Sequence, residues 1–233
     1  MKTSIQFLGA ARTVTGSKHL LTFGDKKVLI DCGMFQGSRE LNARNWLPFG
    51  FEPSELDAVV ITHAHQDHIG LLPRLVREGY TGPIYATAAT IALAKISLPD
   101  SGRIQEEDAR FANKHQISGH NPALPLFTEQ DAYECQKQFV KVGYYQMHDL
   151  PGAAKWQFKP AGHILGSTFA EIYFQNGERI IMGGDLGRYD TPIIKDPAVQ
   201  DSGEYLVLES TYGDRLHSQE NVHEKLEQIL NEM

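Results

Sequence analysis

Hydrophobic and polar positions in the first third of the chain alternate in short runs that are separated by tight turns. This pattern predicts strands, because successive side chains of a strand point to opposite faces of a sheet. The expected strands are Ser4–Leu8, His19–Phe23, Lys27–Ile30, Asp57–Ile61 and Pro83–Ala86. Gly24 and Asp25 lie between the second and the third run, where a hairpin needs turn residues.

Helical spacing follows this strand-rich part. Ile69–Glu78 is expected to form a helix with Pro73 in its first turn and Gly79 as its stop. Residues 88–140 are polar and helical in pattern, with breaks expected near Pro99 and across 119–125. The later elements are predicted strands at Trp156–Phe158, Thr168–Phe174, Arg179–Met182 and Tyr205–Glu209, and a final helix with apolar positions Val222, Leu226, Ile229 and Leu230. The dipeptide Asn176-Gly177 predicts a hairpin between two of these strands.

Two strand-rich halves with helices between and around them predict an α/β fold. Two sheets packed face to face with helices outside, an αββα sandwich, would bury the apolar faces of all these elements. The last predicted helix ends at Met233 with no following element to cover its apolar stripe. We therefore expect the fold to be incomplete at the C-terminus.

Composition and charge narrow the class of protein. The 233 residues are 41% hydrophobic and 22% charged, which is typical of a globular domain. No apolar run approaches the length of about 20 residues that a membrane helix needs, and two cysteines favour a reduced, cytoplasmic protein. The formal net charge of −7 disfavours a broad basic surface for nucleic acid. Bound divalent metals could still supply positive charge locally, where a phosphate reacts.

Candidate chemistry begins directly after the predicted strand that ends at Ile61. His63 and His65 are two positions apart in an extended segment, so their side chains point to the same side and can bind one ion. Asp67 and His68 follow where the chain turns into a helix, and can face a second ion. Imidazole nitrogen and carboxylate oxygen suit zinc, and manganese less well.

Further ligands are expected from distant parts of the chain, because each ion needs three or four protein ligands. His163 follows one late strand and has glycines on both sides of it, at Gly162 and Gly166. Asp185 follows another late strand, and a carboxylate at that place can bridge two metals. Together with the first cluster these residues predict a dinuclear metal site.

These motifs resemble the metallo-β-lactamase superfamily. The resemblance covers nearly the whole chain, and three further segments are similar to its RNA-processing nuclease branch, which carries a β-CASP cap domain: Asp31–Gly37, Pro160–Ser167 and Glu209–Arg215. It implies a metallo-β-lactamase-like domain over 1–210, which includes the helical segment at about 88–140. Residues 211–233 would then begin a truncated cap domain.

The resemblance also implies a role for each site residue. His63, His65 and His163 would bind a first zinc ion, Asp67 and His68 a second, and Asp185 would bridge the two. The second zinc site is expected to be incomplete, because its last histidine in the family has no counterpart here. Glu209 matches an acidic residue that orients a histidine from a later segment.

The implied function is hydrolysis of RNA phosphodiester bonds by a metal-bound hydroxide, in RNA processing or decay. Asp67 would orient the attacking water and accept its proton. RNA is therefore the expected partner, with no membrane. Endonuclease and exonuclease modes both stay open, and so does association between copies of the chain.

Three other functions fit the same motif set in part. A small-molecule hydrolase, such as a thioester hydrolase, would use the same ligands, but the segment Glu209–Arg215 argues against it. A di-iron redox protein of this fold prefers a carboxylate where His65 stands. A catalytically inactive RNA-binding paralogue would be expected to lack some metal ligands, and every ligand expected before the cap is present.

Overall fold

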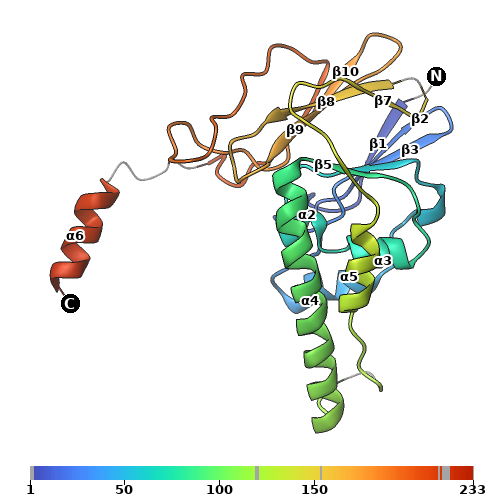
Figure 1. Ribbon diagram of the computed structural model, residues 1–233, viewed down its shortest axis with the longest axis vertical. Helices are drawn as coiled ribbons and strands as arrows, with labels where there is room; N and C mark the ends of the chain where they lie inside the picture. The colour runs from blue at the N-terminus through green and yellow to red at the C-terminus, as the bar shows by residue number, and fades with distance from the viewer. Residues whose placement is uncertain (1–2, 119–120, 153, 215, 217–220, 233) are drawn as a thin grey trace.

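Two β-sheets pack face to face in the computed structural model, which describes residues 3–118, 121–152, 154–214, 216 and 221–232 (Figure 1). The first sheet has six strands in the order β1-β2-β3-β4-β5-β6. They are β1 (Thr3–Phe7), β2 (His19–Phe23), β3 (Lys26–Ile30), β4 (Ala58–Val60), β5 (Ile84–Ala86) and β6 (Phe139–Lys141). Strands β3 to β6 are parallel to one another, and β1 to β3 are antiparallel.

The second sheet has five strands in the order β11-β10-β9-β8-β7. They are β7 (His148–Leu150), β8 (Ala154–Pro160), β9 (Thr168–Tyr173), β10 (Arg179–Met182) and β11 (Tyr205–Val207). Gly177 has a positive φ in the turn from β9 to β10, as the predicted Asn-Gly hairpin requires.

Most helices lie on the outer side of the first sheet (Figure 1). The helical segments are α1 (Arg39–Ala43), η1 (Arg44–Trp46), η2 (Pro53–Glu55), α2 (Gln66–Ile69), α3 (Leu72–Arg77), α4 (Ala88–His115), α5 (Glu129–Gln136) and α6 (Val222–Glu232). Helix α6 lies apart from both sheets (Figure 1). The expected division into a domain over 1–210 and the start of a cap domain over 211–233 stays a prediction. Among the described residues, no helix is long and apolar enough to cross a bilayer.

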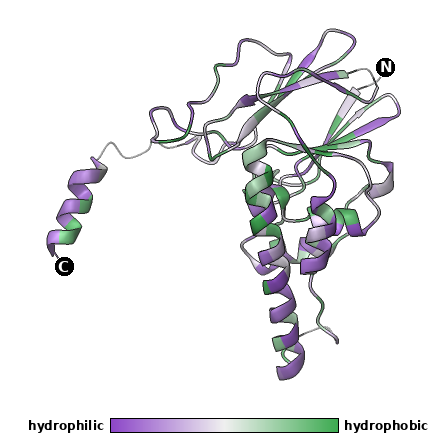
Figure 2. Ribbon diagram, viewed as in Figure 1, coloured by the Kyte–Doolittle hydropathy of each residue, from purple (hydrophilic) through white to green (hydrophobic). Residues whose placement is uncertain are grey.

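Alternating side chains of the strands build two hydrophobic cores. Val28 and Ile30 of β3 point between the sheets, where they pack in one cluster with Trp156 and Phe158 of β8. Leu29, between them in sequence, points the other way and packs in the cluster beneath the helices. The hydropathy colouring shows green stretches on strands of both sheets and mostly purple along the outer half of α4 (Figure 2). The predicted sandwich of two sheets is confirmed.

Two helix predictions were wrong in detail. The single helix expected over Ile69–Glu78 is split into α2 and α3, because Leu71 leaves helical geometry and Pro73 lies in the first turn of a new helix. The break expected near Pro99 is absent, since α4 continues through this residue. Proline leaves the carbonyl four residues earlier without its helical donor. Gln136 Nε2 of α5 donates to that carbonyl, on Lys95, at 3.2 Å and replaces the missing hydrogen bond.

A charged cluster lies on the outer face of the second sheet. The side chain of Glu171 on β9 is fully buried and forms ion pairs with Lys159 Nζ at 2.9 Å and Arg179 Nη1 at 3.6 Å. Tyr173 and Gln157 also donate hydrogen bonds to Glu171 Oε2, at 2.6 and 2.7 Å. Burial alone would raise the pKa of Glu171, but these hydrogen bonds hold it below its usual value.

We expect Glu171→Gln to lower the free energy of unfolding by about 2–3 kcal/mol at pH 7, because it leaves two cations without their buried partner. A lowered pKa stabilises the fold above the unfolded value of about 4.3, and this stabilisation is lost as the pH falls through the folded-state pKa. Urea unfolding between pH 7 and pH 3 measures both effects. The exposed Glu227→Gln is the matched control, and equal stability of the two variants would contradict the role of the cluster.

Candidate metal centre

The predicted cluster of histidines lies where the parallel strands β3 and β4 end. Ile30 of β3 pairs with Val60 of β4, so the residues that follow each strand meet at one edge of the sheet. Asp31 follows β3, and its Oδ1 accepts a hydrogen bond from the backbone N–H of Thr62 at 2.8 Å. This bond holds the segment after β4 in place, and His63 and His65 project from that segment.

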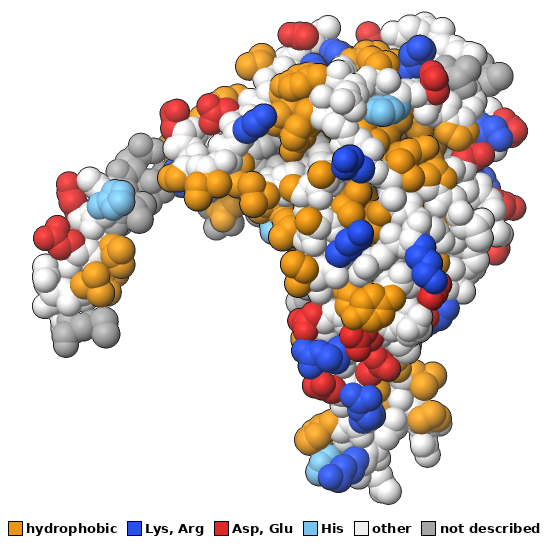
Figure 3. All heavy atoms as spheres, viewed as in Figure 1, with side chains coloured by type: hydrophobic (Ala, Val, Ile, Leu, Met, Phe, Trp, Pro, Cys, Tyr) orange, Lys and Arg blue, Asp and Glu red, His pale blue; other side chains and the backbone are white. Residues whose placement is uncertain are grey.

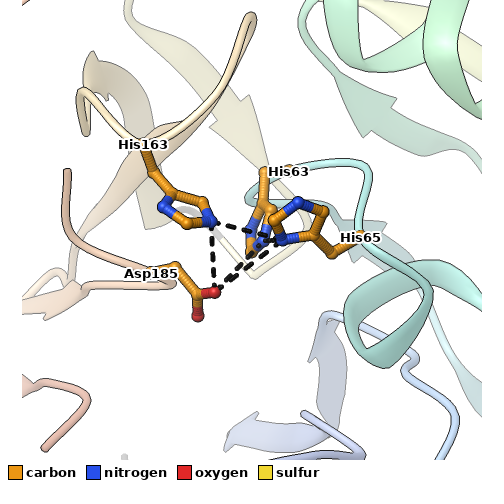
Figure 4. A group of neighbouring side chains, drawn as sticks. All are labelled: His63, His65, His163 and Asp185. Carbon is orange, nitrogen blue, oxygen red and sulfur yellow. Dashed lines mark hydrogen bonds and ion pairs between the residues drawn. The ribbon is translucent and has the colours of Figure 1, made fainter. Parts of the chain in front are cut away.

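Four side chains from three segments point toward one another at this edge (Figure 4). His65 Nδ1 lies 3.0 Å from His63 Nε2 and 3.2 Å from His163 Nε2. Asp185 Oδ2 lies 3.5, 3.9 and 3.4 Å from the facing nitrogens of His63, His65 and His163. The structure therefore brings together residues that are up to 122 positions apart in the sequence.

These distances fit a tetrahedral zinc ion. Zinc binds histidine nitrogen and carboxylate oxygen at about 2.0–2.2 Å, so neighbouring ligand atoms of a tetrahedral site are about 3.3–3.6 Å apart. The five distances of 3.0–3.9 Å between these donor atoms lie around that value. The donor set, three imidazoles and one carboxylate, also suits zinc.

A second group of donors lies on the other side of Asp185. His68 Nε2 is 3.1 Å from Asp185 Oδ1 and 3.8 Å from Asp67 Oδ2. The two oxygens of Asp185 therefore face different groups, Oδ2 the three histidines and Oδ1 the pair Asp67 and His68. This is the arrangement that a bridging carboxylate needs, and all six predicted ligands take part in it.

Burial and charge set the protonation of the histidines differently. Burial lowers the pKa of His63 to about 4, which leaves its imidazole neutral, the form that binds a metal. Burial alone would also lower the pKa of His68, but Asp31 and Asp185 raise it to about 10. The two carboxylates thus favour a positive charge beside them. Protonated His68 supplies this charge, and a bound metal cation would supply it equally.

Asp31 orients His68 and was missed as a site residue from the sequence. Its side chain is buried, and Oδ2 accepts from His68 Nδ1 at 2.6 Å and from Thr62 Oγ1 at 2.9 Å. This leaves His68 Nε2 directed at Asp185. The signal that could have indicated it is an aspartate directly after a strand, the same pattern that predicts Asp185, whereas the motif Asp31–Gly37 indicates only a loop similar to that of the family.

We expect Asp31→Asn to weaken binding of one metal ion by about 10–100-fold, the usual effect of removing a partner that orients a metal ligand. Asparagine keeps the size of the side chain and tolerates the positive φ of 58° at this position. Zinc titration by calorimetry measures the change. Asp190→Asn is the matched control, since Asp190 is exposed and has a φ of 57°. Equal zinc affinities in both variants would contradict a positioning role for Asp31.

The loops that carry His163 and Asp185 pack directly on each other. Gly187 N donates to Ala161 O at 2.8 Å, and a Cβ at Gly187 would lie 1.7 Å from Gly162 O. Ser167 Oγ accepts from the backbone N–H of His163 at 3.0 Å. Only glycine at 187 allows this approach, so the close packing of the two loops fixes the distance between two of the predicted ligands.

Glu209 lies beside the Asp185 loop rather than among the ligands. Its Oε1 accepts from the backbone N–H of Leu186 at 2.7 Å, and its Oε2 accepts from Thr211 Oγ1 at 2.6 Å. Glu209 therefore fixes the residue that follows Asp185. Its predicted role toward a histidine from a later segment stays a prediction.

Known proteins are similar to this chain over most of its length. The profile of the metallo-beta-lactamase superfamily domain matches residues 20–203. A relative named ribonuclease TTHA0252, from Thermus thermophilus, is 42% identical over 94% of this chain and 46% of its own length. Transcription termination factor FttA of Methanocaldococcus jannaschii is 31% identical over 98% of this chain and 35% of its own length.

A third relative comes from a plant. Cleavage and polyadenylation specificity factor subunit 3-I of Arabidopsis thaliana is 28% identical over 94% of this chain and 29% of its own length. The chain thus spans less than half the length of these three curated relatives. The profile match covers most of the chain, and the chain belongs to the metallo-β-lactamase superfamily.

Proposed function

We propose that this chain carries the dinuclear zinc site of a ribonuclease that hydrolyses phosphodiester bonds of RNA. The observation that supports it most is Asp185, whose two oxygens face two separate groups of metal donors. The names of the relatives support RNA as the substrate, because one is a ribonuclease and another a cleavage factor.

The six predicted ligands divide between two ions in this proposal. His63, His65 and His163 would hold the first zinc ion, Asp67 and His68 would hold the second, and Asp185 would serve both. When bound, the two ions would lower the pKa of a water and supply positive charge near the attacking and leaving oxygens of the phosphodiester. The ligands of the second ion are fewer, so we propose that it binds more weakly to this chain.

Asp67 is the residue proposed to orient the attacking water and to accept its proton. Its side chain is partly exposed, at 18%, so water can reach the carboxylate. Its backbone oxygen accepts from the N–H of Ser17 at 2.8 Å, and that of His68 accepts from the N–H of Cys32 at 2.7 Å. These bonds hold the start of α2 rigidly, as a proton acceptor beside a metal requires.

The alternatives are less well supported by this site. An inactive RNA-binding paralogue would not need six ligands placed together, and the other five predicted ligands are grouped around Asp185. A thioester hydrolase would share the ligands, but the relatives reported above have names from RNA biology. We therefore propose the ribonuclease, with residues 211–233 as the start of a cap domain.

We also propose the partner and the cellular compartment of the whole protein. RNA is its proposed partner. Cys32 and Cys135 are both buried free thiols, which supports a reducing compartment, the cytoplasm.

Metal removal tests the proposed function. Full-length protein is expected to contain zinc by elemental analysis and to cleave a labelled single-stranded RNA. Treatment with a chelator should abolish cleavage, and added zinc should restore it, because the ligands need the ion to act on phosphate. A thioester substrate, offered in parallel, distinguishes the rival hydrolase. Cleavage that persists in metal-free protein, or zinc-loaded protein that hydrolyses only the thioester, would contradict the proposal.

A further inference from the structure

A cavity of about 480 Å³ lies behind the loop that carries His163. Four segments line it: the start of α4, residues 141–146, the loop 162–167 and residues 193–195. Gly162 and Ile164 line the cavity, and His163 between them points to the metal centre (Figure 4). One short loop therefore separates the proposed reaction site from the cavity.

The loop between the two sites is held rigidly. Thr87 Oγ1 and Thr90 Oγ1, at the start of α4, both donate to Gly166 O, at 2.8 and 3.1 Å. Tyr144 OH donates to Ser167 O at 3.2 Å, which fixes the aromatic ring in the wall of the cavity. The cavity is thus preformed, and its position relative to His163 is fixed.

The chemistry of the cavity combines apolar walls with a basic rim. Val142, Ile164 and Ile194 supply apolar surface. Lys141 and Lys195 line the rim and are exposed, and neither forms an ion pair with any described residue. Two uncompensated lysines beside an apolar cavity are notable in a chain whose net charge is −7. Figure 3 shows Lys and Arg side chains down this face of the molecule, with Asp and Glu side chains between them along its lower half.

The rim also carries a strained residue. Ile193 has a φ of 73° and is 92% exposed. A β-branched residue in this region is unfavourable, and such strain is concentrated at ligand sites. Because Ile193 is exposed beside the cavity, its side chain provides apolar surface that a bound ligand could cover.

We propose that this cavity binds one nucleobase of the RNA strand whose phosphodiester lies at the metal centre, with Lys141 and Lys195 on neighbouring phosphates. The proposal rests on the proposed ribonuclease function. Proteins that bind single strands combine an apolar or aromatic surface for a base with cations along the backbone. The observed walls and rim match both parts, and the bare charge of the lysines favours a polyanion over a segment of protein.

The first test fills the cavity. Ala89 on the first turn of α4 lines the cavity. The variant Ala89→Trp would fill the cavity and leaves the six predicted metal ligands unchanged. Full-length protein is treated with a chelator, which stops cleavage. Fluorescence anisotropy then measures its affinity for a series of short labelled RNAs, each of which lacks the base at one position. In the parent protein we expect one position at which loss of the base weakens binding about tenfold. In Ala89→Trp this position should lose its effect.

The second test removes the rim charges. Lys141→Ala with Lys195→Ala changes only exposed side chains, so the fold is retained. Loss of two phosphate contacts should reduce the slope of log affinity against log salt by about 1.4 for a single strand. Lys114→Ala is the matched control, because Lys114 is an exposed lysine at the opposite end of α4, about 40 Å away. An unchanged slope in the double variant would overturn the assignment of the lysines.

Hydrolysis of bis(p-nitrophenyl) phosphate separates this proposal from the proposed function. This substrate has no base, so zinc-loaded Ala89→Trp should hydrolyse it as the parent does. If the parent hydrolyses neither this substrate nor RNA, the proposed function is wrong. If hydrolysis is normal but the missing-base profiles of parent and Ala89→Trp are identical, the cavity proposal is wrong. A lower melting temperature or altered oligomeric state, with RNA binding unchanged, would instead assign the cavity to a protein segment.

Discussion

Replacing Asp185 with asparagine is expected to lower kcat/KM for RNA cleavage by about 10⁴-fold or more. Removal of one electrostatic contact at a reaction centre costs about 10²–10³-fold, and Asp185 faces both groups of metal donors. The asparagine side chain has a single oxygen and no charge, so it can serve only one of the two groups. Elemental analysis should accordingly show less than the full zinc content of the parent protein.

Asp190→Asn is the control for this experiment. It makes the same chemical change five residues further along the chain, on an exposed side chain. Parent-like activity in Asp185→Asn would show that Asp185 does not bridge, and that the two groups of donors act separately or not at all.

Replacing Asp67 with asparagine is expected to reduce kcat by about 10³-fold while the fold stays intact. The carboxylate is proposed both to bind the second ion and to accept a proton from water, and proton transfer alone is worth about 10²–10⁴-fold. The backbone contacts of Asp67 are unchanged in this variant, so circular dichroism and the melting temperature should be close to those of the parent.

The exposed Asp108→Asn on α4 is the control for Asp67. Activity of Asp67→Asn within tenfold of the parent would assign Asp67 a purely structural role.

The local part of the candidate site was readable from the sequence. His63, His65, Asp67 and His68 lie within six residues, and the strand before them fixes which way they point. His163 and Asp185 could be nominated because each follows a strand, but their approach to within 3.4 Å depends on glycines that let two loops touch.

Other features depend on contacts that no local pattern reveals. Asp31 becomes important only because β3 and β4 are parallel neighbours, which places it beneath Thr62 and His68. The uninterrupted helix at Pro99 depends on Gln136, a residue from another helix. The cavity beside His163 is built from four separate segments, so no single motif could have indicated it.

The predicted metal ligands come from both sheets, and this has a consequence for the order in which the molecule unfolds. His63, His65 and His68 follow β4 of the first sheet, whereas His163 follows β8 and Asp185 follows β10 of the second. A metal ion bound by ligands from both groups would therefore cross-link the two layers at one edge of the sandwich. Bound ions stabilise only the folded state, by about 4 kcal/mol for each ion at a concentration 1,000 times its dissociation constant. Chelation should thus let the layers separate at this edge first, which protease susceptibility of the loops 162–167 and 184–187 would report before global unfolding.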